Sequence, residues 1–171
     1  MNFDYQIHIP EDFHDLSRVW IYQSSRLFTL QEALQIEEIL DAFVKDWQTH
    51  GTPVKGYANL LFGQFVIIMA DETVTGVSGC STDSSVRIIK QIESLSGVNM
   101  FDRQSLAFVI KDKVQLLPMA QLKYAVDNGF VLPTTLYFNN LVATKKELLQ
   151  NWLQPVSKSW LANRISFPEI A

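Results

Sequence analysis

The fold class follows from three stretches of the chain: Arg18-Val-Trp-Ile-Tyr-Gln23, Tyr57-Ala-Asn-Leu-Leu-Phe62 and Gln64-Phe-Val-Ile-Ile-Met-Ala70. Each stretch is rich in β-branched and aromatic residues, a composition typical of β-strands. Only Gly63 separates the second stretch from the third, so these two strands are predicted to form a hairpin. The three strands are therefore expected to form the centre of a sheet.

A helix is predicted between the first two strands. Thr29 is followed three positions later by Glu32, which is the spacing of a capping box at a helix start. Apolar side chains then recur at steps of three and four residues, which places them on one helix face: Ala33, Ile36, Leu40, Phe43 and Trp47. The dipeptide His50-Gly51 is predicted to end this helix, because glycine favours the left-handed position after a last turn.

A second helix is predicted over residues 84–95 and a further strand over residues 106–110. Residues 18–110 then have the order β-α-β-β-α-β. This is the order of a split βαβ, or ferredoxin-like, α+β sandwich, in which two helices cover one face of a mainly antiparallel sheet.

The rest of the chain is predicted to extend this core. Residues 111–171 give the order β-α-β-α-α, in which Thr144 caps the first of the two last helices and Pro155 starts the second. Residues 1–17 are mixed and polar, and are expected to form a loosely attached N-terminal arm. A chain of 171 residues suits a single domain, 1–171.

Composition excludes several classes of protein. The net charge of −4 and the pI of 5.3 give no general attraction to phosphate backbones, so no nucleic-acid partner is expected. Apolar runs such as residues 65–70 are far shorter than the roughly 20 residues of a membrane span, so no membrane partner is expected either. The N-terminus lacks the pattern of a signal peptide, and a single cysteine suits a reducing compartment. A cytoplasmic protein is therefore expected.

The predicted topology brings two loops together. If the first and third strands lie side by side and run in parallel, the loops that leave them open at the same end of the sheet. Both loops lead into helix N-termini, where free backbone N–H groups and the helix dipole favour anions. An anion- or small-ligand-binding rim is therefore predicted from these residues: Ser24, Ser25, Arg26, Cys80, Ser81, Thr82, Asp83 and Ser84.

Three interpretations of this rim remain open. Ser81, Thr82 and Asp83 can simply cap the second helix. With Arg26 opposite, the same residues can hold a phosphate or carboxylate, which indicates a binding or adaptor protein with a small anionic ligand or a protein partner. Alternatively, Cys80 is the nucleophile of an enzyme, because a thiol at a helix N-terminus can have a lowered pKa. No histidine is expected near Cys80, which favours binding over catalysis.

No cofactor or metal is predicted. His8, His14 and His50 have no metal-ligand spacing and no cysteine partner. The sequence contains neither a Walker A loop nor a dinucleotide-binding fingerprint, which excludes nucleotide hydrolysis of the P-loop kind. The oligomeric state does not follow from the sequence.

Several short motifs are distributed along most of the chain: Trp20-Ile-Tyr-Gln23 followed by Arg26, His50-Gly-x-Pro53, Ser78-Gly-Cys-Ser-x-Asp-Ser-Ser-Val86, Phe138-Asn-Asn-Leu-Val142, and Trp152 through Trp160. In these motifs the chain resembles a family of small bacterial proteins of uncharacterised activity that often carry the automatic label "ABC transporter ATPase". That label implies an ATPase, which the missing Walker A loop contradicts. The resemblance therefore implies Arg26 and Cys80 as positions of interest and no particular chemistry.

Overall fold

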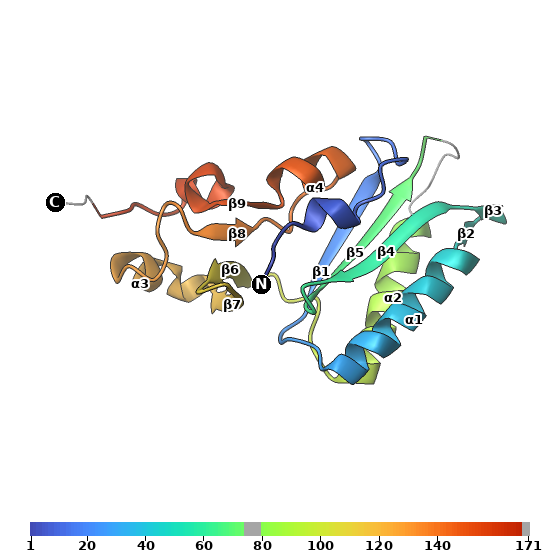
Figure 1. The fold of residues 1–171 in the computed structure, drawn as a ribbon, viewed down its shortest axis with the longest axis horizontal. Coiled ribbons are helices and arrows are strands. Elements are labelled where there is room, and N and C mark those ends of the chain that lie inside the picture. Colours follow the sequence, from blue (N-terminus) through green and yellow to red (C-terminus); the bar gives the residue numbers. More distant parts are fainter. Residues whose placement is uncertain (74–79, 169–171) are drawn as a thin grey trace.

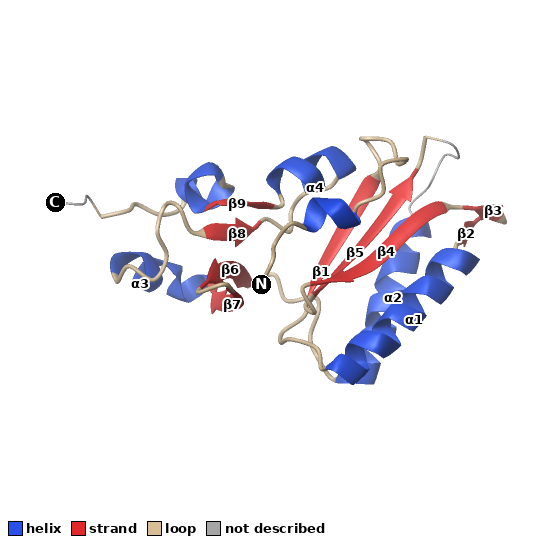
Figure 2. Ribbon diagram, viewed as in Figure 1, coloured by secondary structure: helices blue, strands red, loops and turns tan. Residues whose placement is uncertain are grey.

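The computed structural model describes residues 1–73 and 80–168, and for Cys80 and Ser81 it describes the backbone alone. This part of the chain is an α+β structure with four α-helices and three antiparallel sheets (Figure 2). The helices are α1 (Leu30–Asp46), α2 (Cys80–Ser96), α3 (Leu122–Asp127) and α4 (Lys145–Asn151). The strands are β1 (Arg18–Gln23), β2 (Gln48–Thr49), β3 (Thr52–Pro53), β4 (Lys55–Leu61), β5 (Phe65–Asp71), β6 (Ser105–Ile110), β7 (Lys113–Pro118), β8 (Leu136–Phe138) and β9 (Leu153–Pro155).

The first sheet has the strand order β1-β5-β4, and α1 and α2 lie together on one of its faces (Figure 1). The predicted capping box at the start of α1 is confirmed, since Thr29 and Glu32 each accept a hydrogen bond from the other's backbone N–H. Apolar side chains of both helices pack against Val66, Ile68 and Ala70 of β5, every residue of which is buried. The predicted hairpin of β4 and β5 is also confirmed.

The direction of the strands corrects one prediction. β1 and β5 lie side by side as expected, but they are antiparallel, with Trp20 opposite Ile68. β4 is also antiparallel to β5, so β1 runs parallel to β4 and β5 lies between them. The chain therefore crosses from β1 to the parallel strand β4 through α1. The β4–β5 hairpin then places β5 between β1 and β4.

The predicted fourth strand of the core does not join the first sheet. Instead, β6 belongs to a second sheet of order β7-β6-β8-β9, so the full ferredoxin-like order is not evident. β6 and β7 form an antiparallel hairpin. It turns at Lys111 and Asp112, whose φ angles of 51° and 58° are those of a tight two-residue turn. One face of the second sheet packs against α3 and the C-terminal segment, through a cluster that includes Phe108 and Leu161.

A cluster of aromatic side chains joins the two sheets. Phe65 of β5 stacks on Phe138 of β8 at 4.5 Å between ring centroids, and Trp152 meets both rings edge-on or tilted at 5.3–5.4 Å. The other side of β5 is already covered by α1 and α2, so β5 is the centre of a layered core. Burial of large aromatic rings supplies much of the apolar surface that stabilises such a core.

The N-terminal arm is part of this core, so the prediction of loose attachment is wrong. Tyr5 is 2% exposed in a short 3-10 helix (Tyr5–His8), and its ring lies edge-on to Trp152 at 4.7 Å. Its hydroxyl donates a hydrogen bond to the backbone oxygen of Leu148 at 2.6 Å. Although the arm is mostly polar, a few apolar residues anchor it in the core, among them Ile9 and Phe13.

Two predicted helix boundaries, one end and one start, are also wrong. α1 ends at Asp46, and His50-Gly51 instead forms the turn between the short strands β2 and β3, with φ angles of 50° and 76°. Pro155 ends β9 and precedes two 3-10 helices (Val156–Lys158 and Trp160–Asn163), where an α-helix was expected. The Thr144 cap is confirmed at the start of α4.

Candidate functional site

The second helix begins at Cys80, which confirms the predicted place of this residue at the helix start. The side chains of Cys80 and Ser81 lie outside the described residues, as does the whole of 74–79. The predicted nucleophile and part of the predicted anion site therefore fall where the structure gives no side-chain geometry.

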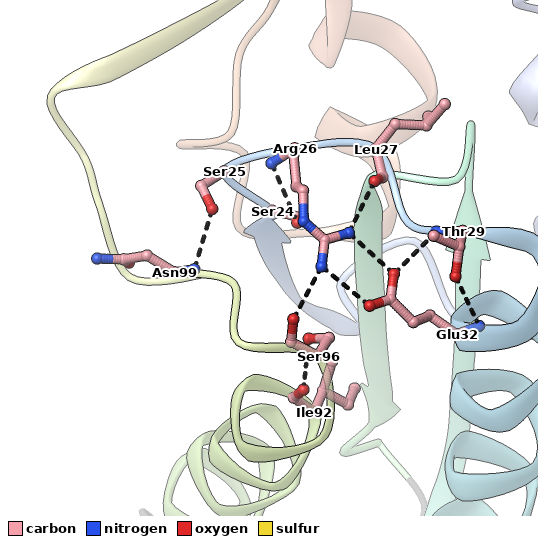
Figure 3. A network of polar contacts seen from close by, with 9 residues as sticks. All are labelled: Ser24, Ser25, Arg26, Leu27, Thr29, Glu32, Ile92, Ser96 and Asn99. Carbon is pink, nitrogen blue, oxygen red and sulfur yellow. Dashed lines mark hydrogen bonds and ion pairs between the residues drawn. The ribbon is translucent and has the colours of Figure 1, made fainter.

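Arg26 lies at the other end of α2, so the predicted rim does not form. Its guanidinium makes two hydrogen bonds of 2.9 Å to the carboxylate of Glu32, and Nη2 donates to the backbone oxygen of Ser96 at 2.8 Å (Figure 3). Ser96 is the last residue of α2 and Cys80 is the first. At about 1.5 Å per residue, a 17-residue helix separates the two ends by roughly 25 Å. The reason is the antiparallel pairing of β1 with β5, which sends the loops after these strands to opposite ends of the sheet.

The contacts of Arg26 are structural. Its positive charge lies at the C-terminal end of α2, where the helix dipole favours a cation, and it also holds the capping carboxylate of α1. The hydrogen bonds from Arg26 are the main reason that the pKa of Glu32 falls from 4.5 to about 2. A lowered folded-state pKa stabilises the fold above the unfolded value and loses that contribution as the pH falls from about 4.5 towards 2. Arg26 thus ties the two helices to each other.

The serines beside Arg26 also make structural contacts. The backbone N–H of Ser25 donates to the backbone oxygen of Asn99 at 2.9 Å, and the N–H of Asn99 donates to Ser25 Oγ at 3.0 Å (Figure 3). Ser24 is fully buried, and its Oγ accepts from the backbone N–H of Arg26 at 3.4 Å. The two hydrogen bonds between Ser25 and Asn99 connect the loop after β1 to the loop after α2.

The arginine at the start of α2 is Arg18. Its Nη2 donates to Thr82 Oγ1 at 3.4 Å, its Nη1 pairs with Glu72 at 3.2 Å, and its guanidinium lies 4.9 Å from the centroid of the Trp20 ring. Of the other predicted rim residues, Asp83 is exposed and Ser84 is half-buried. The structure therefore brings Thr82 to Arg18 at the beginning of β1, whereas the prediction placed it beside Arg26.

A cleft of about 340 Å³ lies between β1 and the second sheet. Every residue of β1, Arg18 to Gln23, lines it. Successive side chains of a strand point to opposite faces, so a cavity that touches all of them in a row lies against the edge of the strand. β5 occupies the other edge of β1. The opposite wall of the cleft contains Ala107 of β6, Phe138 of β8 and residues 140–143.

Arg103 supplies an unneutralised positive charge to this cleft. Among the described residues, the charged side chains that line it are Arg18, Arg103 and Asp102. Arg18 is paired with Glu72, whereas Arg103 forms no ion pair or hydrogen bond with any residue in the described ranges. Asp102 is exposed and accepts a hydrogen bond from the backbone N–H of Gln104 at 2.8 Å. Arg103 is thus the one cationic side chain of the described lining that has no ion-pair partner in the described ranges.

Aromatic side chains stand beside Arg103. Tyr22 and Phe101 meet edge to face at 5.7 Å, and Phe101 is 40% exposed. The hydroxyl of Tyr22 shares a hydrogen bond of 2.9 Å with Ser85 Oγ of α2. Burial raises the pKa of Tyr22, while the bond to Ser85 and the charge of Arg103 oppose that rise. Tyr22 is therefore a neutral phenol at physiological pH, held in place between α2 and the cleft.

A chain of side-chain hydrogen bonds closes one end of the cleft. Trp152 Nε1 donates to Asn140 Oδ1 at 3.0 Å, Asn140 Nδ2 donates to Gln23 Oε1 at 2.9 Å, and Gln23 Nε2 donates to the backbone oxygen of Ser105 at 3.0 Å. These bonds join β1 to β6 and to the segment after β8. Gln23 and Asn140 lie in two of the sequence motifs quoted above but had no predicted role, and Arg103 lies in none of them, because the three residues converge only when β6 leaves the first sheet.

Two other locations are less suited to binding. Asp71 is buried and accepts hydrogen bonds from Thr73 and from the backbone N–H of His14. Burial alone would raise the pKa of Asp71, but these hydrogen bonds and the charge of Lys55 lower it. Asp71 is therefore a structural carboxylate. A groove of about 500 Å³ between α1 and α2 is lined by Trp47, whose Nε1 has no hydrogen-bond partner among the described residues. That nitrogen is buried from solvent, so it offers nothing to a ligand in the groove.

Comparison with models of protein families, with curated proteins and with solved structures finds no match to this chain. Within the described residues, no cluster of three or more histidine, cysteine, aspartate or glutamate side chains is arranged to hold a metal ion. No helix in that part of the chain has the length and apolar content that crossing a membrane requires.

Proposed function

We propose that this protein is a binding protein whose site is the cleft between β1 and the second sheet, and whose ligand is an anion with an apolar body. The observation that carries the proposal is Arg103, an exposed residue that lines the cleft and has no ion-pair partner among residues 1–73 and 80–168. A planar guanidinium is well suited to bind a carboxylate, sulfonate or phosphate through two parallel hydrogen bonds.

The size and the walls of the cleft support the same function. Its volume of about 340 Å³ lies in the range of known ligand pockets, which combine apolar walls with a few polar groups. The aromatic rings of Tyr22 and Phe101 offer apolar surface beside the charge, and Ala107 leaves room on the opposite wall. This site replaces the rim predicted from the sequence, and it requires no covalent chemistry.

Replacing Arg103 with glutamine is expected to weaken the binding of an anionic aromatic probe by about tenfold to a hundredfold, since a hydrogen bond to a charged group contributes about 1.5–3 kcal/mol. The probe is anilinonaphthalene sulfonate, whose fluorescence rises in apolar surroundings, and the measurement is its dissociation constant by titration. Binding to the unmodified protein should also weaken as salt is added, because ions screen the attraction.

The matched control is Arg87→Gln, which removes the same charge from α2 at the edge of the interhelical groove. It should leave the dissociation constant unchanged. Equal affinity of the Arg103→Gln variant and the unmodified protein would contradict the proposal, as would a loss of affinity in Arg87→Gln alone.

A further inference from the structure

The outer edge of β1 carries unused backbone groups. The N–H of Val19 donates to the backbone oxygen of Ala143 at 2.9 Å, so the backbone groups of Val19 point away from β5. Backbone groups alternate in direction along an antiparallel strand, so those of Ile21 also point outward. No group in the described ranges bonds to the N–H of Ile21 or to the backbone oxygens of Val19 and Ile21.

The open part of the edge is bounded at both ends. Before it, the N–H of Lys145 donates to the oxygen of Ser17, and this bond together with the one from Val19 pairs the beginning of β1 with residues 143–145. After it, the side chain of Gln23 is tied to Asn140 and Ser105. The cleft therefore exposes a short length of strand edge centred on Ile21, and residues 141–143 stand on its opposite side.

The two faces of β1 differ in chemistry. Arg18, Trp20 and Tyr22 lie on the side of α1 and α2, where Arg103 adds a positive charge near Tyr22. Val19 and Ile21 lie on the other side, with the apolar cluster of Phe65 and Phe138. A chain paired with β1 would place its successive side chains alternately on these two sides.

We propose that the ligand of the cleft is a short extended peptide segment that pairs with β1 as an added strand, with acidic residues on the side of Arg103 and apolar residues on the side of Ile21. This inference rests on the proposed function and names its ligand class. Strand addition gives affinity through main-chain hydrogen bonds and specificity through alternate side chains. A single extended chain suits the cleft, since the edge of a second folded copy would meet residues 141–143.

The test is a backbone scan of the peptide acetyl-Val-Glu-Val-Glu-Val-amide by calorimetric titration. Each amide is methylated in turn, which removes one N–H and adds bulk. Methylation of the amides that face β1 is expected to weaken binding about tenfold or more, and methylation of the intervening amides to change it less than about twofold. The loss should thus recur at every second position. The matched control peptide, with lysine in place of both glutamates, should bind far more weakly.

The outcomes separate this inference from the proposed function. A uniform effect of methylation, with binding still dependent on Arg103, would overturn strand addition and leave the anion-binding cleft in place. Failure of the peptide to bind, while the dye still binds in an Arg103-dependent manner, would also overturn the peptide ligand alone. Failure of both the peptide and the dye would overturn the proposed function as well.

Discussion

Replacing Trp152 with alanine is expected to lower the free energy of unfolding by about 3–5 kcal/mol, the cost of removing a large buried aromatic side chain. Trp152 is fully buried and packs against Tyr5, Phe62, Phe65 and Phe138. It therefore joins the N-terminal arm, the first sheet and the second sheet. Urea denaturation followed by circular dichroism measures the change.

The same substitution should also impair binding, because Trp152 anchors Asn140 and through it Gln23 at the end of the cleft. Trp152→Phe is the matched control, since it keeps most of the apolar surface and removes the hydrogen bond to Asn140. We expect it to cost less stability than the alanine variant. A Trp152→Ala variant with the stability of the unmodified protein would contradict the assignment of this residue to the core.

Replacing Gly56 with alanine is expected to destabilise the protein by about 1–3 kcal/mol through overpacking. A β-carbon at position 56 would lie 2.5 Å from Cε3 of Trp47, well inside van der Waals contact. Trp47 is 4% exposed and packs against Phe43 at 4.7 Å, so its ring has little room to move. The midpoint of thermal unfolding, followed by tryptophan fluorescence, measures the effect.

A double-mutant cycle identifies the cause of that effect. In a Trp47→Leu background, the shorter side chain leaves space beside position 56, so the added cost of Gly56→Ala should nearly vanish. An equal cost in both backgrounds would show that the glycine is required for its backbone and not for the close approach of the indole ring. Gly51 offers a contrast, because a β-carbon there would meet no atom of the described residues within 4 Å, and the strain of a substitution would come from its φ angle of 76°.

Local sequence patterns predicted the elements of the first layer. The capping box of Thr29 and Glu32 and the apolar stripe through Ile36 and Leu40 indicated α1 correctly, because each depends on residues only three or four positions apart. The β4–β5 hairpin is equally local, and it formed as expected. The predicted end of α1 was less accurate, because the dipeptide His50-Gly51 is suited to a hairpin turn as well as to a helix end, and here it forms the turn between β2 and β3.

The candidate site could not be predicted in the same way, because it depends on strand direction and on contacts distant in sequence. The pairing of β1 with β5 was expected. Because the two strands were assumed to be parallel, Arg26 was predicted at the N-terminal end of α2, whereas it lies at the C-terminal end. The cleft exists because β6 pairs with β7 and β8 instead of with the free edge of β1. No pattern within residues 105–110 distinguishes these alternatives.

The exposed edge of β1 also has a structural cost that a bound ligand would offset. Unpaired strand edges are sites of unwanted association, and proteins commonly cover them or flank them with charge. Here residues 141–143 stand across the edge, and Arg18 and Arg103 flank the space between. This arrangement protects the edge from folded neighbours and leaves it accessible to a single extended chain.

Hydrogen exchange at the amide of Ile21 reports whether a bound peptide pairs with the edge of β1. That N–H faces the cleft and has no partner among the described residues, so it should exchange rapidly in the free protein. Saturation with acetyl-Val-Glu-Val-Glu-Val-amide is predicted to slow its exchange at least about tenfold, because a new main-chain hydrogen bond protects it. The amide of Ile68 in the buried strand β5 should remain slow in both states. An Ile21 amide whose exchange rate is the same with and without bound peptide would show that the peptide does not pair with β1.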